Sequence, residues 1–82
     1  MNNIKKVAKF VAANPDSGDT PMLLELAIAL ETGAEYSFTK LYELSHEGFQ
    51  LAMGMIDDWR LDRYYLSKLT LLDHVEIKRT VQ

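Results

Sequence analysis

Cysteine is absent from these 82 residues, and proline and glycine are scarce, with two and four residues respectively. Without cysteine the chain can form no disulfide, hold no metal through a thiolate and use no cysteine nucleophile. No apolar run approaches the roughly 20 residues that span a bilayer, and the lysines near the N-terminus precede only a short, broken apolar segment. We therefore expect a cytoplasmic protein with no signal peptide and no membrane partner.

The motifs of catalysis, metal binding and phosphate binding are missing as well. The two histidines, His46 and His74, lie 28 residues apart, and neither belongs to an H-x-x-x-H or H-x-x-E pair. No serine stands in a G-x-S-x-G frame, and no glycine-rich loop carries a P-loop lysine. Adjacent Asp57 and Asp58 would point about 100° apart on a helix, so they cannot share one substrate. We expect no enzymatic activity, no metal and no cofactor.

The composition is that of one ordinary globular domain over residues 1–82, with 48% hydrophobic and 26% charged residues. The charge, however, is uneven. Residues 1–15 carry three lysines and no acid, whereas residues 16–58 hold nine acids against Lys40 alone, a net of −8. Residues 59–82 are again basic, with a net of +2. An acidic middle repels phosphate backbones, so we expect no general nucleic-acid binding.

Apolar residues recur at three- and four-residue steps along most of the chain, which predicts an all-α fold. Residues 3–13 form the first such stripe, with lysines on the other side of the helix. A second helix is predicted at about 21–32. We expect Thr20 to be its N-cap, Pro21 to occupy its first position and Gly33 to end it.

Ser37 and Ser45 stand where they can cap two further helices, of which the first would run to about Leu44. Gly54 falls off the apolar stripe of the second, either because a neighbour packs close there or because glycine is simply tolerated. The side chains expected to face the core are Phe38, Leu41 and Tyr42 in the shorter helix, and Phe49, Ala52, Met53, Ile56 and Trp59 in the longer one.

The densest stretch of the chain is "DDWRLDRYY", residues 57–65, which holds three acids, two arginines and the only tryptophan. If one helix ran from 46 to 72, Arg60 and Arg63 would lie within the buried stripe. Burying two unpaired guanidinium groups is too costly to be credible. We therefore predict a break near Asp57–Arg60 that leaves both arginines outside.

After the break a second stripe begins, out of phase with the first. We expect Asp57 or Asp58 to cap the new helix and Trp59 to pack at the corner. In the tail, residues 73–82, an alternation typical of a strand competes with a frayed helical end or an ordered extension, and we favour the helical end or extension. The side chains of the second stripe are Leu61, Tyr65 and Leu72, with Tyr64 and Leu69 nearby.

The same stretch contains residue types that are enriched at binding hot spots. We expect a protein-interaction surface made by Trp59, Arg60, Arg63 and Tyr64. The alternative is that Trp59 and Tyr65 complete a small core while the arginines solvate its rim.

Residues 36–68, "YSFTKLYELSHEGFQLAMGMIDDWRLDRYYLSK", resemble the small, all-helical, uncharacterised bacterial proteins of the YoaC-like kind. The resemblance lies in a short helix with Leu41 and Leu44, then Phe49, then an acid-rich segment of Trp, Arg, Asp and Tyr. It covers under half of the chain. It implies a helical bundle in a cytoplasmic bacterial protein and implies no activity.

Together these patterns predict a compact all-α bundle of four to five short helices, with an irregular or strand-like tail as one possibility. The function they favour is that of a non-enzymatic protein-interaction or accessory module, whose unknown protein partner could be a second copy of the chain. Two alternatives stay open. One is a helix-turn-helix nucleic-acid binder, with residues 38–59 as the two helices and residues 60–82 as a β-hairpin wing. The other is an acidic inhibitor from a mobile element, using the acids of residues 16–58 against a basic target site.

Overall fold

The computed structural model describes residues 2–60 and 65–80, and for residues 74–80 it describes the backbone alone. The helices, in chain order, are α1 (Asn3–Ala13), α2 (Asp19–Thr32), α3 (Phe38–Tyr42), α4 (His46–Trp59) and α5 (Tyr65–Thr80). The predicted all-α bundle is confirmed, and the part of the chain described contains no strand. The strand-like alternative for the tail is wrong as far as Thr80, because α5 continues to that residue.

The helices begin and end largely where local signals place them. The Ser37 hydroxyl accepts a hydrogen bond from the Thr39 N–H at 3.1 Å, and the Ser45 hydroxyl accepts one from the Gly48 N–H at 3.0 Å. Both are N-caps that occupy otherwise unpaired donors of the first turn. Gly33 ends α2 in a left-handed conformation, with φ of 76°, as predicted.

The start of α2 differs from the prediction. The helix begins at Asp19, two residues before Pro21, so Thr20 lies inside the first turn and is not the cap. Its hydroxyl instead donates to the Asn14 carbonyl at 2.5 Å, across the turn that joins α1 to α2. By residue type alone, a threonine in the first turn cannot be distinguished from an N-cap threonine. Here the hydrogen bond to the Asn14 carbonyl decides between the two roles.

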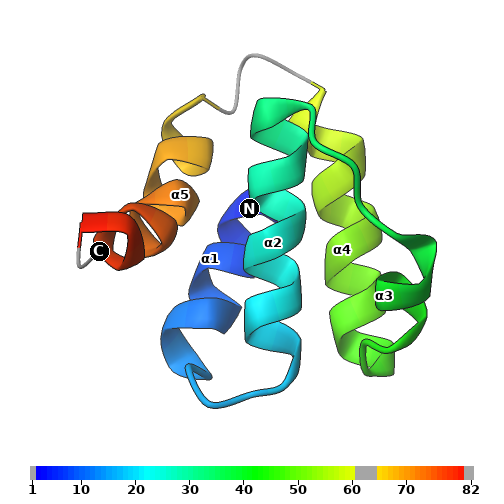
Figure 1. Ribbon diagram of the computed structural model, residues 1–82. Helices are drawn as coiled ribbons and strands as arrows, with labels where there is room; N and C mark the ends of the chain where they lie inside the picture. Colours follow the sequence, from blue (N-terminus) through cyan, green and yellow to red (C-terminus); the bar gives the residue numbers. More distant parts are fainter. Residues whose placement is uncertain (1, 61–64, 81–82) are drawn as a thin grey trace.

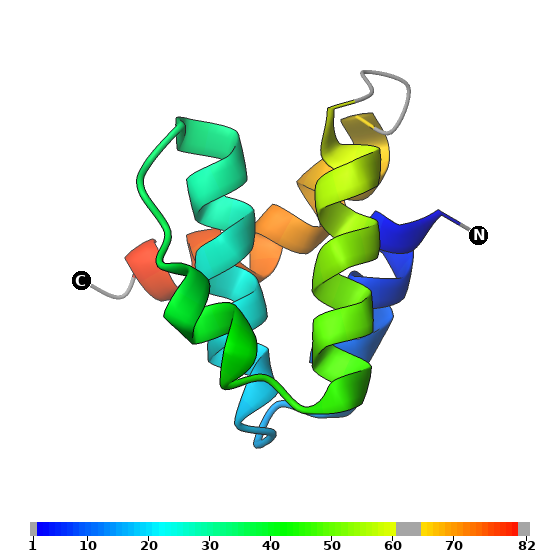
Figure 2. The ribbon, with the colours of Figure 1, turned by 90° about the vertical axis from the view of Figure 1, so that its right-hand side faces the viewer.

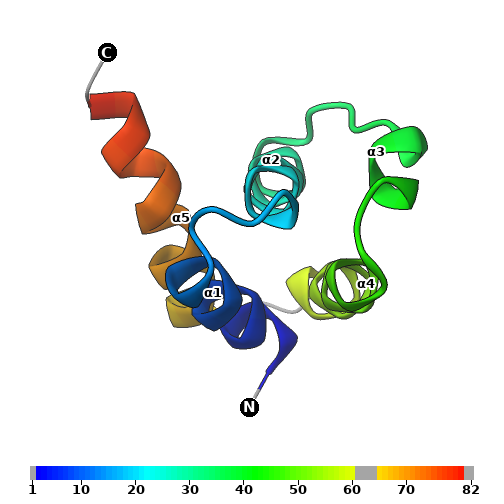
Figure 3. The same ribbon diagram turned by 90° about the horizontal axis from the view of Figure 1, so that it is seen from below.

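Helices α1, α2 and α4 form the centre of the molecule, while α5 and α3 lie on opposite sides of it (Figures 1 and 3). Helix α5 packs on α1 and α2, and α3 packs on α4. Because α2 contacts α1, α4 and α5, it has neighbours on several sides, and apolar residues surround most of its circumference. Its buried apolar residues are Leu23, Leu24, Leu26, Ala27 and Ala29.

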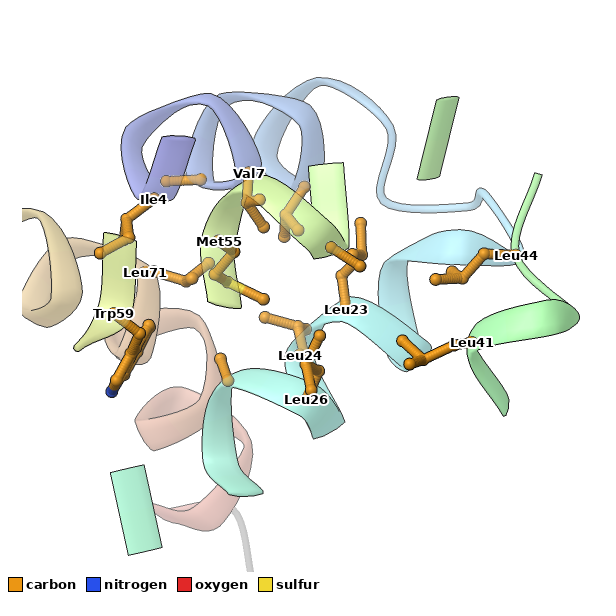
Figure 4. Packing of buried hydrophobic residues seen from close by; sticks show 14 residues of the cluster. Ile4, Val7, Leu23, Leu24, Leu26, Leu41, Leu44, Met55, Trp59 and Leu71 are labelled. Carbon is orange, nitrogen blue, oxygen red and sulfur yellow. The ribbon is translucent and has the colours of Figure 1, made fainter. Parts of the chain in front are cut away.

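The core gathers between the helices, with Trp59 at one end and Leu41 and Leu44 at the other (Figure 4). The apolar stripe predicted for residues 3–13 is buried, and it consists of Ile4, Val7, Ala8 and Val11. The largest side chains that are fully buried are Ile4, Val7, Leu23, Met55 and Leu71.

The buried face of α4 is rotated from the predicted one. It consists of Gly48, Ala52, Met55 and Trp59, at steps of four, three and four residues. Met53, expected in the core, is 37% exposed. The predicted stripe favoured large apolar residues, whereas this face begins with two small residues that allow close approach to neighbouring elements.

Three polar links hold the ends of the helices together. Asp19, in the first turn of α2, accepts hydrogen bonds from both the N–H and the hydroxyl of Ser45, the cap of α4. Asp58 accepts one from the Asn3 N–H at 2.8 Å, and the Asn2 amide donates to the Ser67 hydroxyl at 2.9 Å. Each link satisfies polar groups that would otherwise be poorly solvated at a helix junction.

Gly48 lies directly against the first of these links, so Gly48→Ala should destabilise the fold. A Cβ atom there would lie 2.5 Å from Asp19 Oδ2 and 2.7 Å from its Cγ. The carboxylate cannot withdraw without breaking its bonds to Ser45. We expect a loss of about 1–3 kcal/mol in the free energy of unfolding, measured by chemical denaturation, despite the better helix propensity of alanine.

Gly18→Ala is the matched control. Nothing lies within 4 Å of a Cβ at that position, and its φ of −62° suits alanine. Gly18 is the N-cap of α2 but has helical φ and ψ, so alanine there should change the free energy of unfolding by less than about 0.5 kcal/mol. Equal stability of the two alanine variants would show that α4 does not depend on the close approach at Gly48.

Candidate functional site

The described residues of the predicted interaction surface differ in burial. Trp59 is the last residue of α4 and is only 7% exposed. It belongs to the core cluster, and the Lys68 ammonium lies 5.2 Å from the centre of its ring. The structure thus places Trp59 at a corner of the core, with a cation–π contact closing its outer side.

Arg60 directly follows α4, with its side chain 68% exposed and ion-paired to Asp57 at 3.2 Å. The predicted break in the helix, with this arginine outside the core, is confirmed. Arg63 and Tyr64, the other two members of the predicted surface, lie outside the described residues, as does Leu61. Of the predicted four, Arg60 is the one that the structure shows to be accessible.

Asp58 has a role that the sequence did not indicate. It was expected, with Asp57, as a cap for the helix after the break, but its carboxylate accepts from the Asn3 N–H at the start of α1. A carboxylate at a helix N-terminus both fills an unpaired donor and favours the positive end of the helix dipole. That capping prediction is wrong, because Asp58 ties the end of α4 to α1 and Asp57 pairs with Arg60.

The stripe predicted after the break is also wrong in phase. Tyr65 and Leu69 are exposed, and Tyr65 therefore does not complete the core. Among the described side chains of α5, Leu71 is fully buried, and Leu72, which belongs to the predicted stripe, is half-buried beside the core. Helix α5 crosses α1 and α2, so the inward face is set by that crossing and not by the largest number of apolar residues on one side.

A surface that sequence reasoning assigned to the core lies on α3 and α4. Phe38 and Tyr42, one helical turn apart on α3, are 75% and 77% exposed. The Tyr42 ring stacks with that of Phe49, at 6.5 Å between ring centres and 22° between planes. Phe49 itself is half-buried and packs against the core, as predicted. With the partly exposed Met53, one turn along α4 from Phe49, these four residues define what we term the aromatic surface. Figure 2 shows α3 beside the lower half of α4.

The orientation of α3 explains why its aromatic residues are outside. Leu41 is buried, and Leu44 beyond the helix end is buried with it. The face of α3 that carries Leu41 turns inward, so Phe38 and Tyr42, at the i and i+4 positions, share a face that turns outward. The sequence shows one apolar face with Leu41 and another with Phe38 and Tyr42, but only packing decides which of the two faces turns inward.

Helix α3 is fastened to α2 by polar contacts around Lys40. The Lys40 ammonium pairs with Glu25 at 2.8 Å and lies 5.6 Å from the centre of the Tyr36 ring. The hydrogen bond from Lys40 to the Glu25 carboxylate raises the pKa of Lys40. The Tyr36 hydroxyl donates to the Met22 carbonyl at 3.0 Å, and burial, followed by the negative charge of Glu25, raises the Tyr36 pKa. Each contact is modest, but together they orient α3.

Exposed carboxylates accompany the aromatic surface. Glu43 follows Tyr42, Glu47 lies in the first turn of α4, and Glu35 lies before α3. Among the described residues none of these three takes part in an ion pair. The single lysine of α3 and α4 is already paired to Glu25. The aromatic surface is therefore set in a negatively charged region.

A second exposed apolar surface lies across the molecule, where α5 crosses α1. Leu66 is 76% exposed, and Tyr65 and Leu69 flank it on α5. A depression of about 140 Å³ opens there. Its lining residues are Lys5, Ala8, Leu66, Ser67 and Thr70. We term Lys5, Tyr65, Leu66 and Leu69, with this depression, the α1–α5 surface.

Within the described parts of the chain, no three acidic or histidine side chains converge as a metal site would require. No described helix has both the length and the apolar character needed to cross a bilayer. No protein-family model matches the chain, and neither does any curated protein or solved structure. The resemblance to YoaC-like proteins accordingly stays a prediction.

The adjacent residues Asp57 and Asp58 allow a direct test of the link between α4 and α1. Asp58→Ala leaves the Asn3 N–H unpaired and should cost about 1–2 kcal/mol in the free energy of unfolding. Asp57→Ala removes only an exposed ion pair with Arg60, so it should change stability by less than about 0.5 kcal/mol. Urea denaturation of both variants measures the difference, and equal losses would contradict the capping role of Asp58.

Proposed function

We propose that this protein is a non-enzymatic, cytoplasmic protein-interaction module, and that the aromatic surface of α3 and α4 is where it binds its partner. The observation that carries the proposal is the high exposure of Phe38 and Tyr42. Aromatic residues are enriched at protein interfaces, where a rigid ring buries a large area at small entropic cost. Covering each ring would contribute about 1.5–3 kcal/mol to binding.

The arrangement of these rings supports a binding surface that is already ordered before the partner arrives. Tyr42 is stacked on Phe49, and α3 is held to α2 through Lys40 and Glu25. A partner would therefore meet side chains whose conformational freedom is already reduced, which lowers the entropic cost of binding. Neighbouring Glu35, Glu43 and Glu47 favour a partner with basic groups around its apolar contact.

The helix-turn-helix alternative receives no support from the geometry. Helix α4, which would be the recognition helix, contains three acidic residues and one glutamine, and it contains no lysine or arginine. Residues 65–80, expected as part of a β-hairpin wing, form α5 instead. A negatively charged recognition surface would be repelled by phosphates.

The proposal predicts that Phe38→Ser with Tyr42→Ser removes partner binding without unfolding the protein. Both side chains are largely exposed, so the variant should keep its helical content and lose less than about 1 kcal/mol of stability. In affinity purification from the native host, a protein recovered by the wild-type chain should be absent from the eluate of the double variant. Quantitative mass spectrometry measures the difference.

Lys6→Ser with Ala13→Ser serves as the control, because both positions are exposed on α1 and belong to neither surface. This variant should recover the same partner as the wild type. Undiminished recovery by the Phe38/Tyr42 variant would exclude the aromatic surface. A wild-type bait that recovers nothing beyond the bait-free resin would count against a protein-binding role altogether.

A further inference from the structure

Two exposed apolar surfaces lie on opposite sides of this molecule and differ in charge. The aromatic surface is carried by α3 and α4, and the α1–α5 surface by the helices at the other side (Figures 1 and 3). Clusters of exposed apolar side chains on soluble proteins often mark interaction sites. Two patches on opposite sides can be occupied together when copies of one chain associate.

Charge distinguishes the two surfaces. Exposed Glu43 and Glu47 belong to the elements of the aromatic surface. On α1, Lys5 lines the depression and Lys9 is exposed one helical turn further along. Contact between unlike surfaces thus brings carboxylates toward ammonium groups, whereas contact of the aromatic surface with its own copy would bring carboxylates together.

Size complementarity points the same way. The depression of the α1–α5 surface has a volume of about 140 Å³. An enclosed apolar cavity of roughly 150 Å³ holds a benzene molecule, so this slightly smaller depression, which is open to solvent, can receive part of one aromatic side chain. Phe38 projects from α3 with three quarters of its surface exposed. Lys5 at the edge of the depression would give the inserted ring a cation–π partner.

We propose that the aromatic surface of one copy docks on the α1–α5 surface of a second copy, with Phe38 inserted beside Lys5 and Leu66. The proposal rests on the protein-binding role inferred above and names its partner. A contact between two different surfaces is heterologous and leaves one free surface of each kind at the ends of the assembly. Association therefore continues beyond the dimer as the protein concentration rises.

The test is complementation between two defective variants, followed by sedimentation velocity of the full chain. Phe38→Ser with Tyr42→Ser removes one surface, and Leu66→Ser with Leu69→Ser removes the other. Each variant alone should be monomeric, because its dissociation constant rises by about a hundredfold or more. An equimolar mixture should form a 1:1 dimer that grows no further, because each variant still carries the surface that the other has lost.

The wild-type chain should show a mean mass that increases with concentration and decreases as NaCl is raised from about 0.05 M to about 0.5 M. Lys5→Glu keeps the proposal testable if the serine variants lose their fold. Lys5 is exposed in the first turn of α1, where the helix dipole favours an acidic residue, so this variant should fold as well as the wild type and associate at least about tenfold more weakly.

Three results would overturn the proposal: a wild-type chain that stays monomeric up to about millimolar concentration, a mixture of the two serine variants that forms no dimer, or a Leu66/Leu69 variant that still self-associates like the wild type. The last result would indicate a symmetric contact. None of them affects the affinity purification that tests the proposed function, since that experiment reports binding of any partner to the aromatic surface.

Discussion

Helix α4 is fixed at both ends by an aspartate, and the remaining structure depends on this constraint. At its start the Asp19 carboxylate of α2 accepts two hydrogen bonds from Ser45, which itself caps α4. At its end Asp58 accepts from the first N–H of α1. The two links determine where α4 lies along α1 and α2. They therefore also determine which of its faces is buried.

Glycine and alanine on that face are a consequence of the close approach. Gly48, on the buried face, leaves room for the Asp19 side chain, and Gly54, off that face, leaves room for the side chain of Asn3. The larger Phe49 is half-buried against the core and stacks with Tyr42 of α3, while Met53 is 37% exposed. The position of α4 thus brings Phe49 next to Tyr42 and contributes to the aromatic surface.

The parts of the fold that depend on local signals were predictable from the sequence. The caps Ser37 and Ser45 and the stop at Gly33 act on their own helix. The break after Trp59 was predictable for a related reason, because the cost of burying Arg60 can be judged without knowing its neighbours.

The phases of α4 and α5 were not predictable in this way. Counting apolar residues along a helix favours the face that carries the most large side chains. In α5, however, Leu71 is buried and Leu66 is exposed because of how this helix crosses α1 and α2. For the same reason the sequence did not show which aromatic residues are buried and which are exposed. Trp59 is a residue type common at binding hot spots, but it lies in the core. Phe38 is a residue type common in protein cores, but it is exposed.

The acids of residues 16–58 divide into two groups with different consequences for function. Asp19 and Asp58 bind backbone or cap atoms, and Glu25 and Asp57 have cationic partners. These four carboxylates therefore already have partners within the molecule. The exposed acids without such partners among the described residues are Asp16, Glu31, Glu35, Glu43 and Glu47.

This division bears on the alternative of an acidic inhibitor. An inhibitor that competes for a basic site needs carboxylates free to leave water and meet a target, and Glu25 would first have to break its bond to Lys40 and loosen α3. The free acids Glu35, Glu43 and Glu47 instead lie on the elements that carry or adjoin the aromatic rings. A contact there would combine apolar burial with charge attraction, and the rings would supply most of its free energy because exposed ion pairs contribute little. Charge would then select the partner and its orientation, whereas Phe38 and Tyr42 would hold it.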